Sequence, residues 1–446
     1  MTTDTPRDGL GDDAVAAASS VLARHFSAPV ALREPVVLKS WNRNVVARCA
    51  VRPARLGVAS VVVKQITSQP ARGYTDWASL SFLTALNLEG IAPRFYGGDS
   101  ADGLFVMEDL GGSGSVEDAM LARPDAAPHP TRATPHAAPP SPVHAPTHSS
   151  APLPNENAAP AAAPAAAPAA EQRAARPDED ALPARDALVR LADVTARLHA
   201  ATAAAEAGEG RFDRVRHALP HAEPGGRRRE ADAWLAAAVP ALEGWLWAAG
   251  CRVPTGLDAT LQRISRAFAT PAPWLAFTHG DPAPTNNHVF GGRVTLLDFE
   301  YGGFRHALYD MTGWDTLCPL PGPVVASMRS AYRAALAREA GSTELAGAAA
   351  DDLVFDEAWA TMSAYRAVAI LGWLGPGVLR ENRPWVGAWS ARAALLAVTE
   401  RLPSLLERTT TLAPLHEAAT TLGHALRQRW PEFDGTMVTP AWPGLE

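Results

Sequence analysis

Lysine and cysteine are both scarce in this chain of 446 residues. Lysine occupies only two of the 40 basic positions, as Lys39 and Lys64, and arginine fills the others. The three cysteines, Cys49, Cys251 and Cys318, are too few and too scattered to form a disulfide framework or a zinc site. The sequence is therefore not that of a small disulfide-stabilised secreted domain, and the two lysines stand out from their arginine-rich background.

Long apolar runs and a strong charge of one sign are also lacking. The most apolar stretch, 233–250, is interrupted by Pro240 and Glu243, so we expect no membrane-spanning segment. A net charge of −7 argues against a nucleic-acid-binding protein held by phosphate contacts. The acidic, polar start of the chain resembles neither a secretory signal nor a mitochondrial presequence. We expect a cytoplasmic protein without a membrane or nucleic-acid partner, and the sequence leaves its oligomeric state open.

The first hundred or so residues have the pattern of a small β-sheet. Valine-rich runs at 36–39, 45–51 and 59–66 are separated by turn residues, and apolar residues then recur at helical spacing from 77 to 88. Two further short apolar runs follow, at 91–96 and 104–107. The pattern predicts about five strands with one helix inserted after the third.

The composition changes abruptly over 123–183, where alanine and proline dominate. Fifteen of the 39 prolines lie in this stretch, and alanine offers too little apolar area to offset the entropy of the chain. We interpret it as a disordered insertion, and we interpret its four irregularly spaced histidines as part of a solvated linker rather than a metal site.

The remainder of the chain is predicted to be mainly helical, with one hairpin. An apolar stripe runs from Leu188 to His199, and further amphipathic helices are expected at 229–249, 258–269, 323–340, 354–374, 388–407 and 412–429. One β-like interruption lies at 287–299, where a Gly-Gly pair separates two apolar runs, as in a hairpin.

Three oxygen-bearing side chains flank this hairpin at short spacing. Asp281 follows a His-Gly pair that permits a sharp loop, Asn286 lies five residues further on, and Asp298 ends the second apolar run. Because the hairpin reverses the chain, Asp298 is expected to return to the neighbourhood of Asp281 and Asn286. Two carboxylates and an amide oxygen are hard ligands that suit Mg²⁺ bound together with phosphate oxygens.

These residues resemble the catalytic signature of the aminoglycoside phosphotransferase family, which is related to choline kinases and, more distantly, to protein kinases. The signature consists of 279–281, Asn286 and 298–300; in addition, 61–64 resembles the third-strand lysine motif, and 105–110 resembles the hinge between the lobes. The resemblance covers about 30–440 without the insertion. It implies an α+β, two-lobed protein-kinase-like fold with a small antiparallel β-sheet lobe that carries one helix and a large, mainly helical lobe that carries a catalytic hairpin.

The resemblance also implies a division of the chain and an activity. Residues 1–110 would form the nucleotide-binding lobe and hinge, and 111–446 the catalytic and substrate lobe, with the insertion 123–183 inside it. The implied activity is transfer of the γ-phosphate of ATP, or GTP, to a hydroxyl group of a small molecule. The implied cofactor is Mg²⁺.

The family mechanism assigns a role to each matching position. Asp281 would act as the base on the acceptor hydroxyl, and Asn286 and Asp298 would hold Mg²⁺. The nucleotide would be bound by a lysine, its carboxylate partner and two hinge residues: Lys64, Asp76, Glu108 and Leu110. The catalytic loop would be supported by His279 and Asp310.

The sequence departs from the family pattern in one place and from the pattern of protein kinases in two others. The usual glutamate partner of the strand-three lysine is replaced by Asp76, which is one methylene shorter. The turn between the first two strands, 40–44, lacks the glycine-rich motif of protein kinases, and Glu300 occupies the place of the glycine that follows Asp298-Phe299 in those enzymes. These features argue against an ordinary protein kinase.

Each candidate also has a purely structural interpretation. Asp281, Asn286 and Asp298 are residue types common in turns, and Lys64 could be a solvated lysine of an edge strand. The spacing of the first three and the apolar neighbours of Lys64 on its own strand face favour a site. For Lys39 a surface position is the better interpretation, and for His199 a packed and hydrogen-bonded one. Helix core is the favoured interpretation of three tryptophans, Trp373, Trp385 and Trp389, and a flat wall for a substrate is the alternative.

The acceptor is the least determined part of the prediction. An aminoglycoside is the first hypothesis, and it would require carboxylates lining the cleft, for which the candidates are Glu300, Asp310, Asp315, Glu357 and Glu381. A neutral sugar, a choline-like molecule or an amino-acid metabolite is the alternative acceptor. A catalytically inactive, kinase-like nucleotide-binding or regulatory module is the alternative from another class. The presence of all four residues Lys64, Asp281, Asn286 and Asp298 favours an active enzyme.

Overall fold

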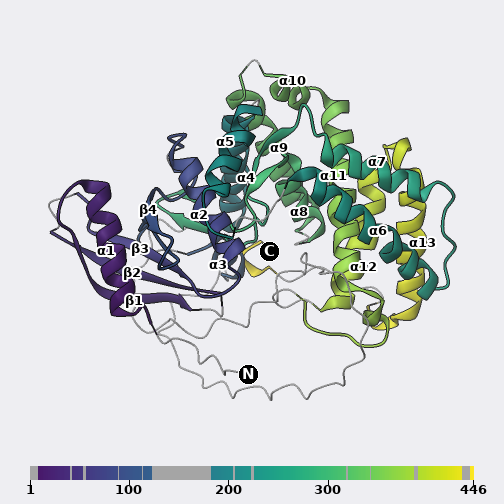
Figure 1. Cartoon of the computed structure of the whole chain (residues 1–446). Coiled ribbons are helices and arrows are strands. Elements are labelled where there is room, and N and C mark those ends of the chain that lie inside the picture. The colour runs from purple at the N-terminus through teal and green to yellow at the C-terminus, as the bar shows by residue number, and fades with distance from the viewer. Residues whose placement is uncertain are drawn as a thin grey trace.

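The computed structural model describes 9–40, 43–53, 57–88, 90–112, 114–122, 182–203, 206–221, 226–317, 320–341, 343–385, 390–433 and 442–445. The insertion predicted at 123–183 therefore lies outside the described residues, apart from its last two. Figure 1 shows a small β-rich lobe, in purple and blue, beside a larger lobe made mainly of helices. This two-lobed α+β arrangement confirms the predicted fold class.

The small lobe is built on a five-stranded antiparallel sheet. Its strands are β1 (Ala31–Ser40), β2 (Asn44–Arg52), β3 (Ser60–Ile66), β4 (Phe95–Asp99) and β5 (Leu104–Glu108), in the spatial order β1-β2-β3-β5-β4. Helix α2 (Pro70–Thr84) is inserted after the third strand. The predicted strands and helix are therefore confirmed.

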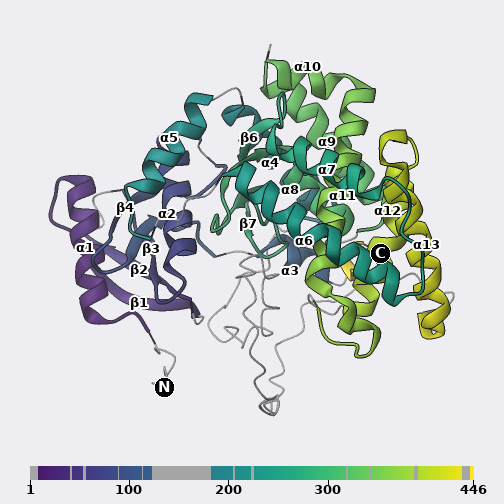
Figure 2. The same cartoon turned by 45° about the vertical axis from the view of Figure 1, so that its right-hand side comes forward.

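Helix α1 (Asp12–Phe26) was not predicted, and it decides which face of the sheet is available to a site. It lies along one side of the sheet in Figures 1 and 2, where its buried side chains form a common core with alternate residues of the strands, including Ala47 and Val63. Because successive strand residues point to opposite faces, Lys64 points to the other face, which is not covered by α1. The helix could have been found, because Ala14, Ala18, Val21 and Leu22 recur at helical spacing.

The large lobe contains every long helix that the sequence predicted. These are α4 (Ala184–Thr202), α6 (Arg227–Ala248), α7 (Leu257–Ala269), α9 (Gly322–Glu339), α11 (Asp352–Leu374), α12 (Ala391–Leu406) and α13 (Ala413–Arg429). Four shorter helices were not predicted: α3 (Val116–Leu121), α5 (Glu206–His217), α8 (Leu308–Thr316) and α10 (Glu344–Ala350). Helices of six to twelve residues contain too few turns to show a clear period.

The large lobe also contains more β-structure than the single predicted hairpin. That hairpin is confirmed as β7 (Asn287–Phe290) and β8 (Arg293–Leu296). A second antiparallel pair joins β6 (Leu275–Thr278) to β9 (Gly303–His306), so the expectation of only one β-interruption was wrong. Strands of four residues buried against helices show little alternation, which is why the sequence pattern did not reveal them. The pair matters because the loop that carries Asp281 starts at the end of β6.

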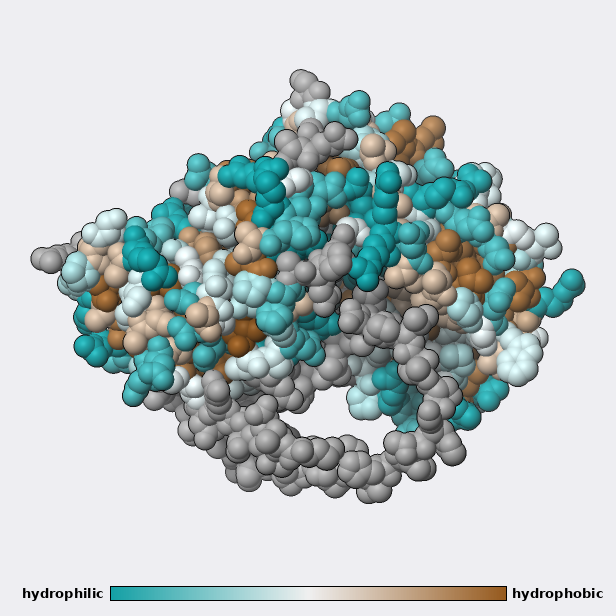
Figure 3. Space-filling model, in the orientation of Figure 1, coloured by the Kyte–Doolittle hydropathy of each residue, from teal (hydrophilic) through white to brown (hydrophobic). Residues whose placement is uncertain are grey.

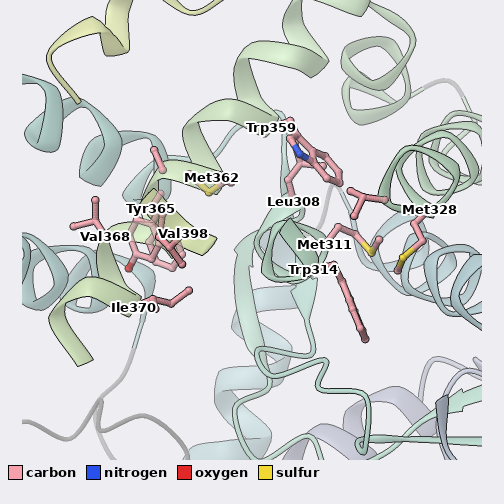
Figure 4. Close-up of a cluster of buried hydrophobic side chains, with 14 of the residues drawn as sticks. Leu308, Met311, Trp314, Met328, Trp359, Met362, Tyr365, Val368, Ile370 and Val398 are labelled. Carbon is pink, nitrogen blue, oxygen red and sulfur yellow. The ribbon is translucent and has the colours of Figure 1, made fainter. Parts of the chain in front are cut away.

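The core of the large lobe surrounds helices α8 and α11. Figure 4 shows the side chains Leu308, Met311 and Trp314 of α8 beside Met328 of α9 and Trp359 and Met362 of α11. Trp385 is buried in this core and Trp373 packs against it, which confirms the structural interpretation for these two; Trp389 lies outside the described residues.

The face of the molecule drawn in Figure 3 is mostly hydrophilic, with the larger groups of hydrophobic residues at the right of the view. Elsewhere on this face, hydrophobic side chains are scattered among hydrophilic ones. Of the helices in the described parts of the chain, none combines the length and the apolar character that a membrane crossing needs.

Candidate functional site

The loop that follows β6 can form only because residue 280 is glycine. Gly280 has φ +85°, and an added Cβ would lie 2.3 Å from the carbonyl oxygen of Tyr301. Both features exclude a larger side chain. The sharp loop predicted at the His-Gly pair is therefore present, and it turns the next residue, Asp281, out of the strand.

A buried carboxylate holds this loop in place. The Oδ2 and Oδ1 atoms of Asp310, in α8, accept hydrogen bonds from the amides of His279 (2.7 Å) and Gly280 (2.9 Å). His199 Nε2 lies 3.0 Å from Asp310 Oδ2, and His199 Nδ1 lies 2.7 Å from the Tyr332 hydroxyl. Burial alone would raise the pKa of Asp310, but the hydrogen bond and charge of His199, the charge of His279 and the Gly280 amide together outweigh it, and the pKa is lowered. Asp310 therefore supports the loop by hydrogen bonds, and His199 is a buried, hydrogen-bonded residue as expected.

His279 joins the loop to the hairpin. Its Nε2 lies 2.7 Å from the carbonyl oxygen of Leu297, so Nε2 carries the proton, and Nδ1 accepts the amide of Asp281 at 3.3 Å. Both ring nitrogens are thus engaged by neutral backbone groups, one in the loop and one at the end of the hairpin.

The hairpin returns Asp298 to the loop, as predicted from the Gly-Gly pair. Gly291 and Gly292 both have positive φ values (54° and 72°), which suits a two-residue hairpin turn. Beyond the last paired strand residue, the amide of Leu297 donates to the carbonyl oxygen of Asn286 at 3.0 Å. The Leu297 carbonyl is held by His279. The N–H and C=O of Leu297, the residue before Asp298, are therefore both held by the loop that carries Asp281.

Asp281 and Asn286 contact each other directly. Asn286 Nδ2 donates to the backbone oxygen of Asp281 at 3.0 Å and to its Oδ2 at 3.3 Å. Because the nitrogen is used in this way, the amide oxygen Oδ1 is left with only a long contact to the Thr285 hydroxyl at 3.4 Å. Burial raises the pKa of Asp281. A raised pKa makes this carboxylate a better proton acceptor than an ordinary surface aspartate.

Lys64 lies between two carboxylates from opposite lobes. Its Nζ is 2.6 Å from Asp76 Oδ2, on α2, and 2.6 Å from Asp298 Oδ1, and the whole residue is only 4% exposed. Burial alone would lower the pKa of Lys64, but the two carboxylates outweigh it and the pKa is raised. Burial would likewise raise the pKa of Asp298, and Lys64 and, more weakly, Lys39 bring it down to about 2. The site therefore carries a fixed positive charge and an ionised Asp298.

Asp76 forms the ion pair with Lys64 even though its side chain is one methylene shorter than that of glutamate. Besides Lys64, it accepts the backbone amide of Phe299 through Oδ1 at 2.9 Å. Burial raises the pKa of Asp76, and Lys64 acts against that shift. The carboxylate of Asp76, on helix α2, thus connects strand β3 to Phe299. Asp298, the residue before Phe299, has φ +64°.

Two places where the sequence differs from protein kinases, the turn 40–44 and Glu300, contact each other. Arg43, in the turn between β1 and β2, donates from Nη1 to both carboxylate oxygens of Glu300, at 2.9 and 3.2 Å. The Glu300 side chain is 9% exposed. This ion pair fixes the turn that lacks glycines onto the segment after Asp298, and neither residue was predicted to do so.

The hinge is held by a residue that the sequence interpretation did not single out. Asp109 forms an ion pair with Arg48 of β2 at 2.7 Å and accepts the Ser60 hydroxyl at 2.6 Å. Of the two hinge residues expected to contact nucleotide, Glu108 accepts the amide of Arg94 at 3.1 Å, and the Leu110 carbonyl lies 3.0 Å from His288 Nε2. The nucleotide contacts of Glu108 and Leu110 stay predictions.

The oxygen atoms near Asp298 fit a magnesium ion that is shared with phosphate. Within the described ranges, no three His, Cys, Asp or Glu side chains are placed to hold a metal ion by themselves. The carboxylate of Asp298 and the amide oxygen of Asn286 would supply part of an octahedral shell, which phosphate oxygens and waters complete in sites of this kind. The residues present therefore fit Mg²⁺ only in the company of a phosphate ligand.

No family model matches the chain, and neither does any curated protein sequence. Solved structures that are similar to it include a choline/ethanolamine kinase family protein from Mesorhizobium loti, with 13% identity, a TM-score of 0.39 and coverage of 87% of this chain and 92% of the other. An ethanolamine kinase from Plasmodium vivax has 9% identity, a TM-score of 0.42 and coverage of 89% and 84%. A macrolide 2'-phosphotransferase from Brachybacterium faecium has 14% identity, a TM-score of 0.40 and coverage of 85% and 97%. The two-lobed fold itself is established by the strand order and helices of this chain.

Proposed function

We propose that this protein is an enzyme that transfers the γ-phosphate of ATP to a hydroxyl group of a small molecule. The observation that carries the proposal is the convergence of Lys64, Asp281, Asn286 and Asp298 from two lobes onto one place. Two carboxylates, an amide oxygen and a buried ammonium group are the groups that phosphoryl transfer needs, because the protein's task there is mainly to position charges.

In the proposed reaction each side chain acts through the contacts that it makes in the fold. Asp281 accepts the proton of the acceptor hydroxyl, or orients it, from a loop fixed by Asp310 and His279. Lys64 holds the α- and β-phosphates with an ammonium group that Asp76 keeps in position. Asn286 and Asp298 would hold Mg²⁺, which, when bound with ATP, offsets the charge of the phosphoryl group that is transferred.

The position of the carboxylates bears on the acceptor. Of the five acidic residues that could have lined a cleft for a polycationic aminoglycoside, Glu300 is paired with Arg43 and Asp310 holds the catalytic loop. Asp315 accepts Trp359 Nε1 at 2.8 Å and lies 3.6 Å from Arg401 Nε. The other two, Glu357 and Glu381, are exposed on the surface. These five residues therefore do not form a carboxylate-lined site that would favour a polycation over other hydroxyl compounds.

The proposal predicts that nucleotide and metal together stabilise the protein. With millimolar ATP and Mg²⁺, the melting temperature of the full chain is expected to rise, because ligand binding to the folded state adds RT ln(1 + [L]/Kd) to its stability. ATP with EDTA should give a smaller rise. ADP release on adding a panel of alcohols, sugars, amino acids and aminoglycosides then identifies the acceptor. A melting temperature that no nucleotide changes would contradict the kinase assignment, whatever the acceptor.

Lys39 is expected to strengthen nucleotide binding modestly. It pairs in register with Val46, which pairs with Lys64, so both lysines point to the same face of the sheet about 10 Å apart. Lys39 is exposed, as predicted. Its positive charge contributes to the lowered pKa of Asp298. Lys39→Ala should raise the KM for ATP by roughly two- to fivefold with little change in kcat, and less at high salt, because exposed charges are screened.

The matched control for Lys39 is Arg24. It is an exposed cation of the same lobe, but it lies on α1, on the opposite face of the sheet, beside Asp99. Arg24→Ala should leave the KM for ATP unchanged. Equal effects of Lys39→Ala and Arg24→Ala would show that Lys39 acts only through the general charge of the protein.

A further inference from the structure

A buried arginine of the large lobe lacks the partners that buried charges normally have. Arg366, on α11, is 3% exposed, and its Nε atom is buried without a hydrogen-bond partner. No ion pair of its guanidinium group occurs within the described residues. Leaving a buried cation without a compensating anion costs several kcal/mol in general, and an anionic ligand would offset that cost.

A neighbouring arginine shows how unusual this is. Arg305 and Arg366 both contact the ring of Tyr309, with Cζ atoms 5.7 and 4.4 Å from its centroid. Arg305 is fully engaged: it pairs with Glu230 at 2.8 Å and donates to the Tyr301 carbonyl at 2.9 Å. Arg366 has only the face of the aromatic ring, which offsets part of the charge. The two guanidinium groups share one ring, yet within the described residues only Arg305 has a carboxylate at ion-pair distance, and the charge of Asp281 acts on Arg366 from further away.

Arg366 is also close to the proposed catalytic loop. An added Cβ at Gly313 would lie 3.2 Å from Arg366 Nη2, so the guanidinium group lies against the bare backbone of α8. The same helix carries Tyr309 and, next to it, Asp310, which holds the loop. Burial raises the pKa of Asp281, and the charge of Arg366 acts in the opposite direction.

A second unsatisfied polar group lies on the same helix face as Arg366. Ser363 is three residues earlier on α11, so the two side chains are neighbours on that face. Its hydroxyl is fully buried and has no partner among the residues that the structure describes. A hydroxyl and a guanidinium group together are suited to an acidic oxygen group, which accepts hydrogen bonds from both.

We propose that the phosphate acceptor of this enzyme carries an anionic group, a carboxylate or a phosphate, which binds to Arg366 while its hydroxyl lies at Asp281. This inference rests on the proposed function and specifies its substrate class. An arginine fork binds a carboxylate or phosphate with two parallel hydrogen bonds, so the anion would fix the orientation of the acceptor as well as its affinity.

The test uses two small anions as probes on the full-length protein. With saturating ADP and Mg²⁺ present to fill the nucleotide site, malonate and inorganic phosphate are titrated and the melting temperature is recorded. Wild-type protein is expected to be stabilised by at least one of them, and which one acts distinguishes a carboxylate from a phosphate. Arg366→Met should raise the Kd of that anion by about 10- to 100-fold, the range for charge-assisted hydrogen bonds.

The stability of the free protein separates binding from a structural role. Arg366→Met removes an unpaired buried cation, so its melting temperature without anion should be equal to that of wild type or higher. Arg305→Met is the matched control and should lower it, because Glu230 is left unpaired. If the methionine variant folds poorly, Arg366→Lys is used instead. Lysine keeps the positive charge but lacks the paired donors of the guanidinium group, so a Kd of the anion raised by about three- to thirtyfold supports the proposal.

Several results would overturn the inference and leave the kinase assignment standing. In the first, ADP raises the melting temperature of the wild type but neither malonate nor phosphate raises it further. In the second, the Kd of the anion is the same in Arg366→Met or Arg366→Lys as in the wild type. Turnover gives an independent readout with glycerate, glycerol 3-phosphate, glycerol and choline as acceptors. If choline or glycerol is the best of these and Arg366→Met leaves its kcat/KM unchanged, the acceptor needs no anion. Loss of the ADP response itself would instead contradict the proposed function.

Discussion

Asp281→Ala is expected to lower kcat by about 10²- to 10⁴-fold, with a smaller change in the KM for ATP. General-base catalysis is typically worth that factor, and Asp281 is the carboxylate that the His-Gly loop presents. Asp281→Asn should lose almost as much, because the amide keeps the shape but cannot accept the proton. The measurement is steady-state ADP release with the acceptor that the screen identifies.

The same variants should leave the fold intact. Asp281 accepts only one long side-chain hydrogen bond, from Asn286 at 3.3 Å, and burial raises the pKa of its carboxyl group. A raised pKa in the folded state means that ionisation of Asp281 costs folding free energy, so a neutral residue should not reduce the melting temperature.

The control for Asp281 is another buried aspartate of the same lobe that lies outside the site. Asp315→Ala leaves the Trp359 indole N–H without its acceptor and should cost about 1–3 kcal/mol of stability while kcat stays within about threefold of wild type. The two aspartates thus predict opposite patterns. Full turnover by Asp281→Ala on the identified acceptor would show that another group is the base.

Most of the site was predictable because its residues are close in sequence. The segment 275–310 contains the loop, the hairpin and Asp310, and the two positive-φ glycines at 291 and 292 determine where the chain reverses. Short-range turn chemistry was enough to predict that Asp298 returns to Asp281 and Asn286. The longer helices were predictable for a similar reason, since several turns make the apolar period visible.

The contacts that sequence reasoning missed join distant segments. Arg43 and Glu300 are 257 residues apart, and Arg48 and Asp109 are 61 residues apart. Nothing in the local pattern of any of these residues differs from that of a solvated surface charge. The isolation of Arg366 was equally hidden, because a missing partner is a property of the packed helices α8 and α11 and has no sequence signal. The residue proposed to bind the anionic group of the acceptor is therefore one that only the structure could single out.

Lys64→Met is expected to lower both activity and stability. Without the ammonium group, the phosphates lose a preorganised positive charge, which is typically worth about 10²- to 10³-fold in kcat/KM. Asp76 and Asp298, each 2.6 Å from Nζ in the wild type, are left facing each other without a cation. Removing one partner from a buried ion pair generally costs about 3–5 kcal/mol, measured here by denaturant unfolding.

A double variant separates these two effects. Lys64→Met/Asp76→Asn removes one of the two opposed charges and keeps an acceptor for the Phe299 amide, which donates to Asp76 Oδ1 in the wild type. Its stability should recover by a large part of the loss, and its activity should not recover. If activity returned together with stability, Lys64 would be needed for folding and not for binding phosphate.

Lys64→Arg tests why this position is lysine in a chain that otherwise uses arginine. The ammonium group of Lys64 is a compact charge that reaches two carboxylate oxygens from a residue only 4% exposed. The planar guanidinium fork needs more room and presents its donors in fixed directions, so arginine should restore less than about one hundredth of the wild-type kcat/KM. Lys39, the other lysine, is exposed, and Lys39→Arg should keep kcat/KM within about threefold, since only charge is required there. Equal tolerance of arginine at both positions would contradict the buried, two-carboxylate role of Lys64, because a site that needs only positive charge would accept either side chain.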